Sequence, residues 1–227
     1  MRKSHIGAVM LAVALTGTMA PTAQAQSDEA VAAALALMLT PAGSFANVSP
    51  AALGRGGSGL GADYGRYSGD FERNAYGLHL DWHSLRATLG VGTATGVENT
   101  WMAGASAGRT MFSATALQVG LEGNAGLGRI KDDDTDATLN AFSAGARLPL
   151  SMTFDGEAVS FVPYVAPGGF FGRLSSGGES ESGFRMTLNG GVRVGFSNGV
   201  AVDVGVQRIF IDEAETLFGV GLSLVRW

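Results

Sequence analysis

The chain has 227 residues, of which 35 are glycine and none is cysteine, and its formal net charge is −5. This length suits one domain, the absence of cysteine excludes disulfides, thiolate metal sites and cysteine nucleophiles, and the acidic balance argues against a nucleic-acid surface. Charged residues make up 15% of the chain, below the usual share of about 25%. The glycines are spread among apolar residues, which favours closely packed, bent strands.

The first segment has the three parts of a secretory signal peptide. Arg2 and Lys3 give it a positive start, residues 6–19 are apolar and uncharged, and residues 23–25 (Ala-Gln-Ala) supply a small-x-small cleavage site. We therefore expect residues 1–25 to direct export and to be cleaved after Ala25. An uncleaved anchor is the alternative, although the apolar run is shorter than the roughly 20 residues that a spanning helix needs.

Residues 26–56 form a separate N-terminal segment, for which we expect a short helix and a linker. Ser27 and Asp28 can cap a helix over residues 27–39, whose interior is rich in Ala and Leu, and residues 41–43 (Pro-Ala-Gly) end it. This helix is too short to span a bilayer. Its apolar surface must therefore be covered by the following domain or by a membrane surface.

From residue 57 to residue 227 the dominant sequence period is two, which is the period of a β-strand. In the clearest case, Phe184 and Phe196 lie on the apolar parity at opposite ends of one segment. At about 3.3 Å per residue and a tilt of about 45°, they are separated by roughly 28 Å, close to the ~25 Å apolar band of a membrane barrel. Other aromatic residues on the apolar parity near strand ends are Tyr76, Trp82, Trp101 and Phe218.

The composition of the polar parity indicates which face is outside. It consists mostly of Gly, Ser, Thr and Asn, with few charges per strand. This is too few for a surface in water, so we expect the apolar parity to face lipid and the polar parity to line the interior. A soluble barrel with an apolar interior is the alternative.

Connection lengths predict the number of strands. Short connections are expected at residues 83–84, 113–115, 155–157 and 197–199, and longer ones at 68–74, 96–99, 131–136, 174–182 and 211–215. Short and long connections alternate, as in barrels with an even number of strands. The predicted fold is therefore all-β, an antiparallel up-and-down transmembrane β-barrel over residues 57–227, with ten strands or, as the alternative, eight.

These features together resemble the small outer-membrane β-barrel proteins, the broad OmpA-like and "outer membrane protein beta-barrel domain" group. Besides the signal peptide and the strand pattern, the resemblance rests on residues 162–169 (Val-Pro-Tyr-Val-Ala-Pro-Gly-Gly) and on the aromatic C-terminus, Trp227. It implies a place in the outer membrane of a Gram-negative bacterium, contact with lipid and lipopolysaccharide, and delivery by export and barrel-assembly machinery. Trp227 departs from the family pattern, because it is off the apolar parity; a bulge near Val225 would reconcile the two.

The inward parity carries charges of both signs. The acids are Asp63, Asp81, Glu122 and Asp203, the arginines are Arg86, Arg147, Arg185 and Arg193, and His79 and His83 lie near one end. Charges in a narrow lumen must be paired or hydrated. A balanced set favours a closed, charge-paired lumen, whereas a selective pore favours one sign.

His79, Asp81 and His83 share one strand face, a geometry that suits a metal site or acid–base chemistry. No third ligand or serine nucleophile is tied to them by spacing, so we assign no catalytic residue, metal or cofactor. We expect a structural or interaction barrel without turnover, with its oligomeric state left open. The alternatives are a narrow porin-like transporter, a lipid-modifying barrel enzyme, and a soluble periplasmic barrel that binds an apolar ligand.

Overall fold

The computed structural model describes residues 58–68, 73–94, 97–131, 138–176, 179–210 and 215–226, which form strands and the turns between them. The predicted signal peptide (residues 1–25), the helix predicted over residues 27–39, and Trp227 lie outside the described residues. No helix in the described ranges is long and apolar enough to cross a membrane.

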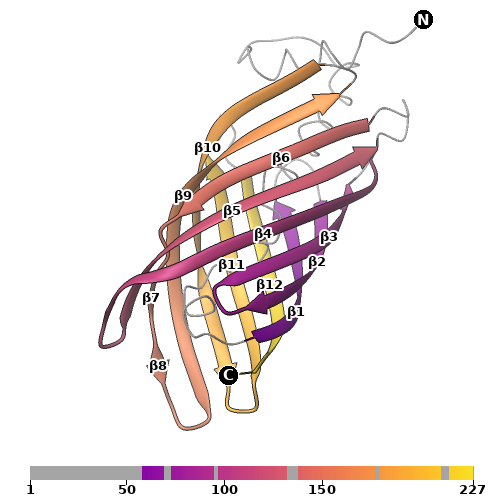
Figure 1. Ribbon diagram of the computed structural model, residues 1–227. Coiled ribbons are helices and arrows are strands. Elements are labelled where there is room, and N and C mark those ends of the chain that lie inside the picture. The colour runs from indigo at the N-terminus through magenta and orange to yellow at the C-terminus, as the bar shows by residue number, and fades with distance from the viewer. Residues whose placement is uncertain are drawn as a thin grey trace, which may run out of the picture.

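The strands close into a ten-stranded antiparallel barrel (Figure 1). In chain order they are β1 Ser58–Ser68, β2 Arg73–Trp82, β3 Leu85–Ala94, β4 Val97–Ala114, β5 Leu117–Lys131, β6 Thr138–Arg147, β7 Leu150–Met152, β8 Phe154–Asp155, β9 Val159–Ser176, β10 Glu179–Phe196, β11 Val200–Phe210 and β12 Glu215–Arg226. β1 pairs with β2 on one side and with β12 on the other, so the first and last strands seal the sheet. Closure leaves no open backbone edge along this seam, which is the condition for a sheet to cross lipid.

The labels β6, β7 and β8 describe one interrupted strand position. β6 and β7 both pair with β5 and β9, and β8 continues along β9. The first interruption falls at Leu148 and Pro149, because proline has no N–H to give to the ladder. The neighbouring strands adapt: the amide of Gly120 donates to the carbonyl of Pro149 (2.7 Å), and the amide of Leu148 donates to that of Pro167 (2.9 Å). Counted as one, these pieces give the predicted ten strands.

The connections alternate between the two ends of the barrel. Those at one end, here called the turn end, are residues 83–84, 115–116, 156–158 and 197–199. Those at the other, the loop end, include residues 69–72, 95–96, 132–137, 177–178 and 211–214, which are outside the described residues. β12 finishes at the turn end, where Leu224 pairs with Val200 beside the turn between β10 and β11 (Figure 1). The connections alternate between the two ends as predicted, but two that were expected to be long are short. Only residues 95–96 separate β3 from β4, and only residues 177–178 separate β9 from β10.

The two parities face opposite ways, as predicted. Along β2, His79 and Asp81 are buried whereas Leu78 and Leu80 are exposed (62% and 56%). The aromatic residues expected on the outward parity are all exposed: Tyr76, Trp82, Trp101, Phe184, Phe196 and Phe218. An apolar outer face around a polar interior is the arrangement of a membrane barrel and the reverse of a soluble one.

Glycines make room for large side chains in the narrow interior. The imidazole of His79 lies across Gly61, its register partner on β1, so that a Cβ on Gly61 would overlap the ring. Gly168 is similarly covered by Arg147, whose Cβ would be 2.6 Å from a Cβ placed there. The glycine-rich composition therefore supplies space inside the barrel as well as bending of the strands.

Candidate functional site

Toward the turn end, the interior of the barrel holds a band of charged side chains contributed by seven strands. Its members are Asp63, His79, Asp81, Arg86, Glu122, Arg147, Arg193 and Asp203, none of which is more than 6% exposed. We call this set the lumen network. Because ions buried in this way are costly unless paired, the partners of each member decide what the network can do.

One part of the network is a continuous chain across β1, β2 and β3. The His79 Nδ1 lies 2.7 Å from the Asp63 Oδ2, and its Nε2 lies 3.7 Å from the Asp81 Oδ2. Arg86 holds Asp81 in a bidentate pair, with Nε donating to Oδ1 (2.5 Å) and Nη2 donating to Oδ2 (2.8 Å). A fork-on-carboxylate pair of this kind fixes both side chains in direction as well as distance.

A second pair joins β5 to β6. Arg147 and Glu122 are register partners, and the guanidinium donates through Nε to Oε2 (2.9 Å) and through Nη2 to Oε1 (2.5 Å). Glu122 is completely buried. The pair thus spans two adjacent strands with both carboxylate oxygens satisfied.

A looser pair joins β10 to β11. Arg193 and Asp203 are register partners, with Nη1 3.6 Å from Oδ2, and Arg193 Nη2 donates to the Ser223 Oγ of β12 (3.5 Å). Every one of the four carboxylates predicted to face inward therefore has a cationic or imidazole partner. Three of these carboxylates are paired with an arginine, and Asp63 is paired with the imidazole of His79.

Two predicted members lie elsewhere. His83 is exposed in the turn between β2 and β3 with a φ of 57°, so the prediction that it faces the lumen is wrong. The alternation ends at Trp82, and the left-handed turn residue swings the imidazole next to the indole, with ring centroids 5.8 Å apart. Arg185 is half-buried nearer the loop end and donates to the carbonyl of Phe184 (3.0 Å), outside the lumen network.

Sequence reasoning missed an apolar layer inside the barrel toward the loop end. Its members, all 4% exposed or less, are Met102, Ile130, Leu139, Phe170, Leu174, Ile209 and Leu217. β9 explains why: Phe170 points inward and Phe171 outward, so both parities are apolar there and alternation carries no signal. This layer separates the lumen network from the loop end.

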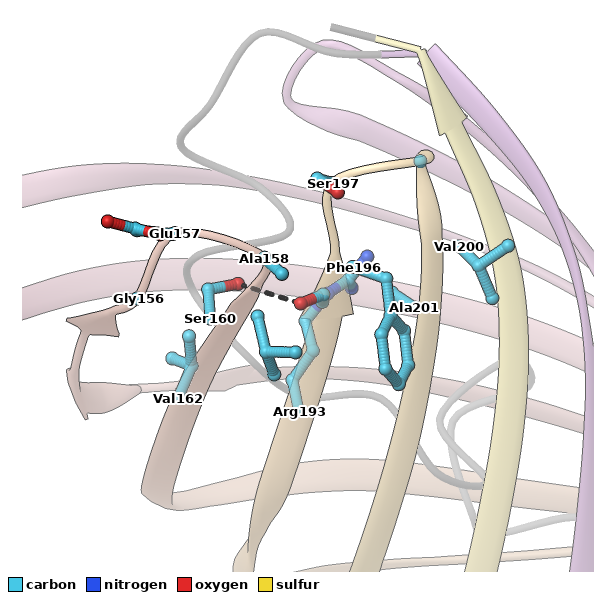
Figure 2. A pocket seen from close by; sticks show the side chains of 13 residues that line it. Gly156, Glu157, Ala158, Ser160, Val162, Arg193, Phe196, Ser197, Val200 and Ala201 are labelled. Carbon is cyan, nitrogen blue, oxygen red and sulfur yellow. Dashed lines mark hydrogen bonds between the residues drawn. The ribbon is translucent and has the colours of Figure 1, made fainter.

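A small cavity of about 210 Å³ opens at the turn end between the turn that follows β8 and the turn that follows β10. Figure 2 shows Arg193 reaching it from the lumen network, with Ser160 and Ala201 on either side. Ser160 Oγ contacts the carbonyl of Gly195 (3.5 Å), which ties β9 to β10 beside the cavity. Arg193 also contacts Asp203 and Ser223, so the cavity adjoins the lumen network.

His79 lies between the carboxylates of Asp63 and Asp81, an arrangement that suits proton exchange among these three groups. Within the described part of the chain, no group of three His, Cys, Asp or Glu side chains is placed to hold a metal ion.

Comparison with known proteins identifies the fold class. No protein-family model and no curated protein sequence matches the chain. Among solved structures, the β domain of the Bordetella autotransporter BrkA is similar, with a TM-score of 0.53 and 12% identity over 74% of this chain and 99% of that one. The fold is that of an outer-membrane β-barrel. Weaker similarities include the N-terminal β-barrel domain of Pseudomonas aeruginosa OprF (TM-score 0.34, 11% identity, 75% and 99% coverage) and Ail of Yersinia pestis (0.33, 16%, 75% and 97%).

Proposed function

We propose that the chain is an exported outer-membrane β-barrel with a closed lumen, which serves the cell envelope as a structural or interaction protein. The observation that carries this proposal is the pairing within the lumen network, in which Asp63, Asp81, Glu122 and Asp203 each face a cationic or imidazole partner. Ion-selective pores that use charged side chains have rings of one sign, which are free to interact with passing ions. Side chains that are already paired with one another are not available to interact with passing ions.

The apolar layer supports the same proposal. It lies between the lumen network and the loop end and is lined by long side chains such as Met102 and Phe170. Hydrophobic constrictions exclude water and ions from narrow pores. An ion entering from the loop end would meet this barrier before reaching any paired charge.

We orient the barrel with its turn end in the periplasm and its loop end outside the cell. This assignment follows the rule that membrane barrels have short periplasmic turns and longer outer loops. It places the end of β12 in the periplasm.

Planar-bilayer recording of the purified, refolded full chain tests the closed lumen. We expect no steady, large conductance at moderate voltage. Opening of large channels by the wild-type protein would overturn the proposal in favour of the porin-like alternative. A variant with Met102→Ala and Phe170→Ala should conduct more often than wild type if the apolar layer is the barrier.

Gel mobility and fractionation test the membrane assignment separately. A folded outer-membrane barrel migrates differently before and after boiling and remains with the outer-membrane fraction. A soluble chain with no mobility shift would reject the membrane location altogether, whatever the conductance.

A further inference from the structure

A row of small residues borders the lumen network at its turn-end side. The row lies one inward position beyond Arg193 and crosses four neighbouring strands, β9 to β12. Its members, in register, are Ser160, Gly195, Ala201 and Ser223. The first three line the cavity of about 210 Å³ together with Arg193. The cavity therefore exists because the positions just beyond the guanidinium carry almost no side chain.

Arg193 is the least firmly held of the three arginines in the lumen network. Arg86 and Arg147 each hold a carboxylate through two hydrogen bonds. In contrast, Arg193 Nη1 lies 3.6 Å from the Asp203 Oδ2 and has no hydrogen-bond partner among the described residues. The Arg193 side chain is only 5% exposed, and a buried donor without an acceptor costs free energy. A ligand in the cavity that accepts a hydrogen bond from this guanidinium removes that cost.

A hydroxyl group lies on the same side of the cavity as the guanidinium. The Ser160 Oγ has a long contact, 3.5 Å, with the carbonyl of Gly195. Figure 2 shows this hydroxyl directed from β9 toward β10, the strand that carries Arg193, whereas the carboxylate of Glu157 at the rim points away. The cavity thus presents one cationic and one neutral donor to a bound molecule.

Other parts of the cavity wall are apolar. Val162 and Ala201 are each 2% exposed and line the cavity with Arg193. A cavity of about 150 Å³ is enough for a benzene ring. A volume of about 210 Å³ therefore has room for a molecule of about six non-hydrogen atoms.

Charge and shape together indicate the class of ligand. The two oxygens of a carboxylate match the planar donor fork of a guanidinium, and a short aliphatic chain matches Val162 and Ala201. Arg193 has a single positive charge and already faces Asp203. A ligand with two negative charges would therefore leave more charge uncompensated than a ligand with one. A monocarboxylate fits this site better than a phosphate dianion.

We propose that the cavity at the turn end binds a short aliphatic carboxylate. Its oxygens accept hydrogen bonds from Arg193 and Ser160, and its chain packs on Val162 and Ala201. This inference goes beyond the proposed structural role, because it gives the barrel a small-molecule ligand. Entry of the ligand from the periplasm rests on the proposed orientation, whereas binding to the purified protein does not.

Equilibrium dialysis of the refolded full chain tests the site. The probe is radiolabelled butyrate, in a buffer free of other carboxylates and of phosphate, with detergent alone as the blank. We expect saturable binding of one butyrate per chain. Butyramide, which has the same shape without the charge, should bind about tenfold more weakly, since hydrogen bonds to charged groups are the stronger ones. Inorganic phosphate at the same concentration should compete poorly.

Two variants locate the binding to the cavity. Ser160→Leu fills the cavity and keeps the pair of Arg193 and Asp203, whereas Arg193→Gln/Asp203→Asn removes the guanidinium without leaving a buried carboxylate unpaired. Each should bind butyrate about tenfold more weakly than wild type. Ser113→Leu is the matched control, because it places the same side chain on an exposed position near the turn end of β4. It should bind as wild type does.

Four results would overturn the inference. They are no binding of butyrate above the detergent blank, equal binding of butyrate and butyramide, full competition by phosphate, and wild-type binding by a folded Ser160→Leu variant. The mobility shift on boiling shows which variants are folded. The comparison of butyrate with butyramide needs only wild type, so it decides even if neither cavity variant folds.

The same samples separate this inference from the proposed function. If wild type shows the mobility shift and opens no large channels but binds no butyrate, the inference fails and the proposed function stands. If wild type opens large channels, or shows no shift and is soluble, the proposed function fails whatever the result with butyrate.

Discussion

At the scale of single residues, the barrel interior is arranged as pairs of one large side chain and one glycine. His79 reaches Asp63 only because Gly61, opposite it on β1, has no side chain. Arg147 likewise lies over Gly168 while it holds Glu122. The lumen network therefore depends on these glycines, although they contribute no polar side chain to it.

Gly61→Ala tests this dependence. The new methyl group overlaps the His79 ring, so we expect the free energy of unfolding to fall by about 1–3 kcal/mol, the usual cost of overpacking. Gly123→Ala is the control, since a Cβ there meets only the carbonyl of Gly145, at 3.9 Å. Urea unfolding in lipid vesicles gives both values. Equal stability of the two variants would contradict the role assigned to Gly61.

The pair of Glu122 and Arg147 provides a second test. Arg147→Met leaves a carboxylate buried without a partner, so we expect a loss of about 3–5 kcal/mol in the free energy of unfolding. Glu122→Met combined with Arg147→Met should regain much of this loss, because no charge is then stranded. The same unfolding measurement decides. If the double variant is as unstable as the single one, the loss of stability comes from the missing pair and not from an unpaired charge on Glu122.

At the scale of elements, strand periodicity predicted most of the fold. The parity of Phe184 and Phe196, the four short turns and the total of ten strands follow from alternation and from turn residues alone. Other features need information that alternation lacks. Serine, glycine and glutamate around residues 174–182 are typical of a loop, yet β9 and β10 pair there.

The candidate site, like the fold, was predicted only in part from the sequence. Inward parity correctly selected the acids and three arginines, because a polar residue on a regular strand has only two directions available. It placed His83 wrongly because the strand had already ended, and a left-handed turn residue obeys no parity. The bulge expected near Val225 is absent from the described register, which pairs β12 with β1 regularly up to Arg226.

The outer face of β2 offers a test of membrane depth. Leu78 lies near the middle of this strand on the exposed face. Leu78→Arg should cost about 2–4 kcal/mol, the depth-dependent penalty of arginine at the bilayer midplane. Thr93→Arg, near the loop end of β3 on the same face, should cost about 0–1 kcal/mol. Equal penalties in vesicle unfolding would argue against a belt centred on Leu78.

At the scale of the whole molecule, the proposed orientation can be measured on intact cells. An epitope inserted at residues 177–178 should be accessible to antibody without permeabilisation, since that connection lies at the loop end. An epitope inserted at residues 197–199 should be accessible only after the outer membrane is opened. The reverse result would overturn the proposed orientation of the barrel.

The seam between β1 and β12 also sets the order in which the barrel is able to mature. Ser58 pairs with Arg226, so the contact that closes the cylinder joins the two most distant parts of the described chain. Contacts of such long range form slowly. Until they do, β1 and the most recently added strand both present unpaired amides and carbonyls, each of which costs several kcal/mol in hydrocarbon. Insertion is therefore close to all-or-none, and a chain truncated before Glu215 lacks the strand that closes it.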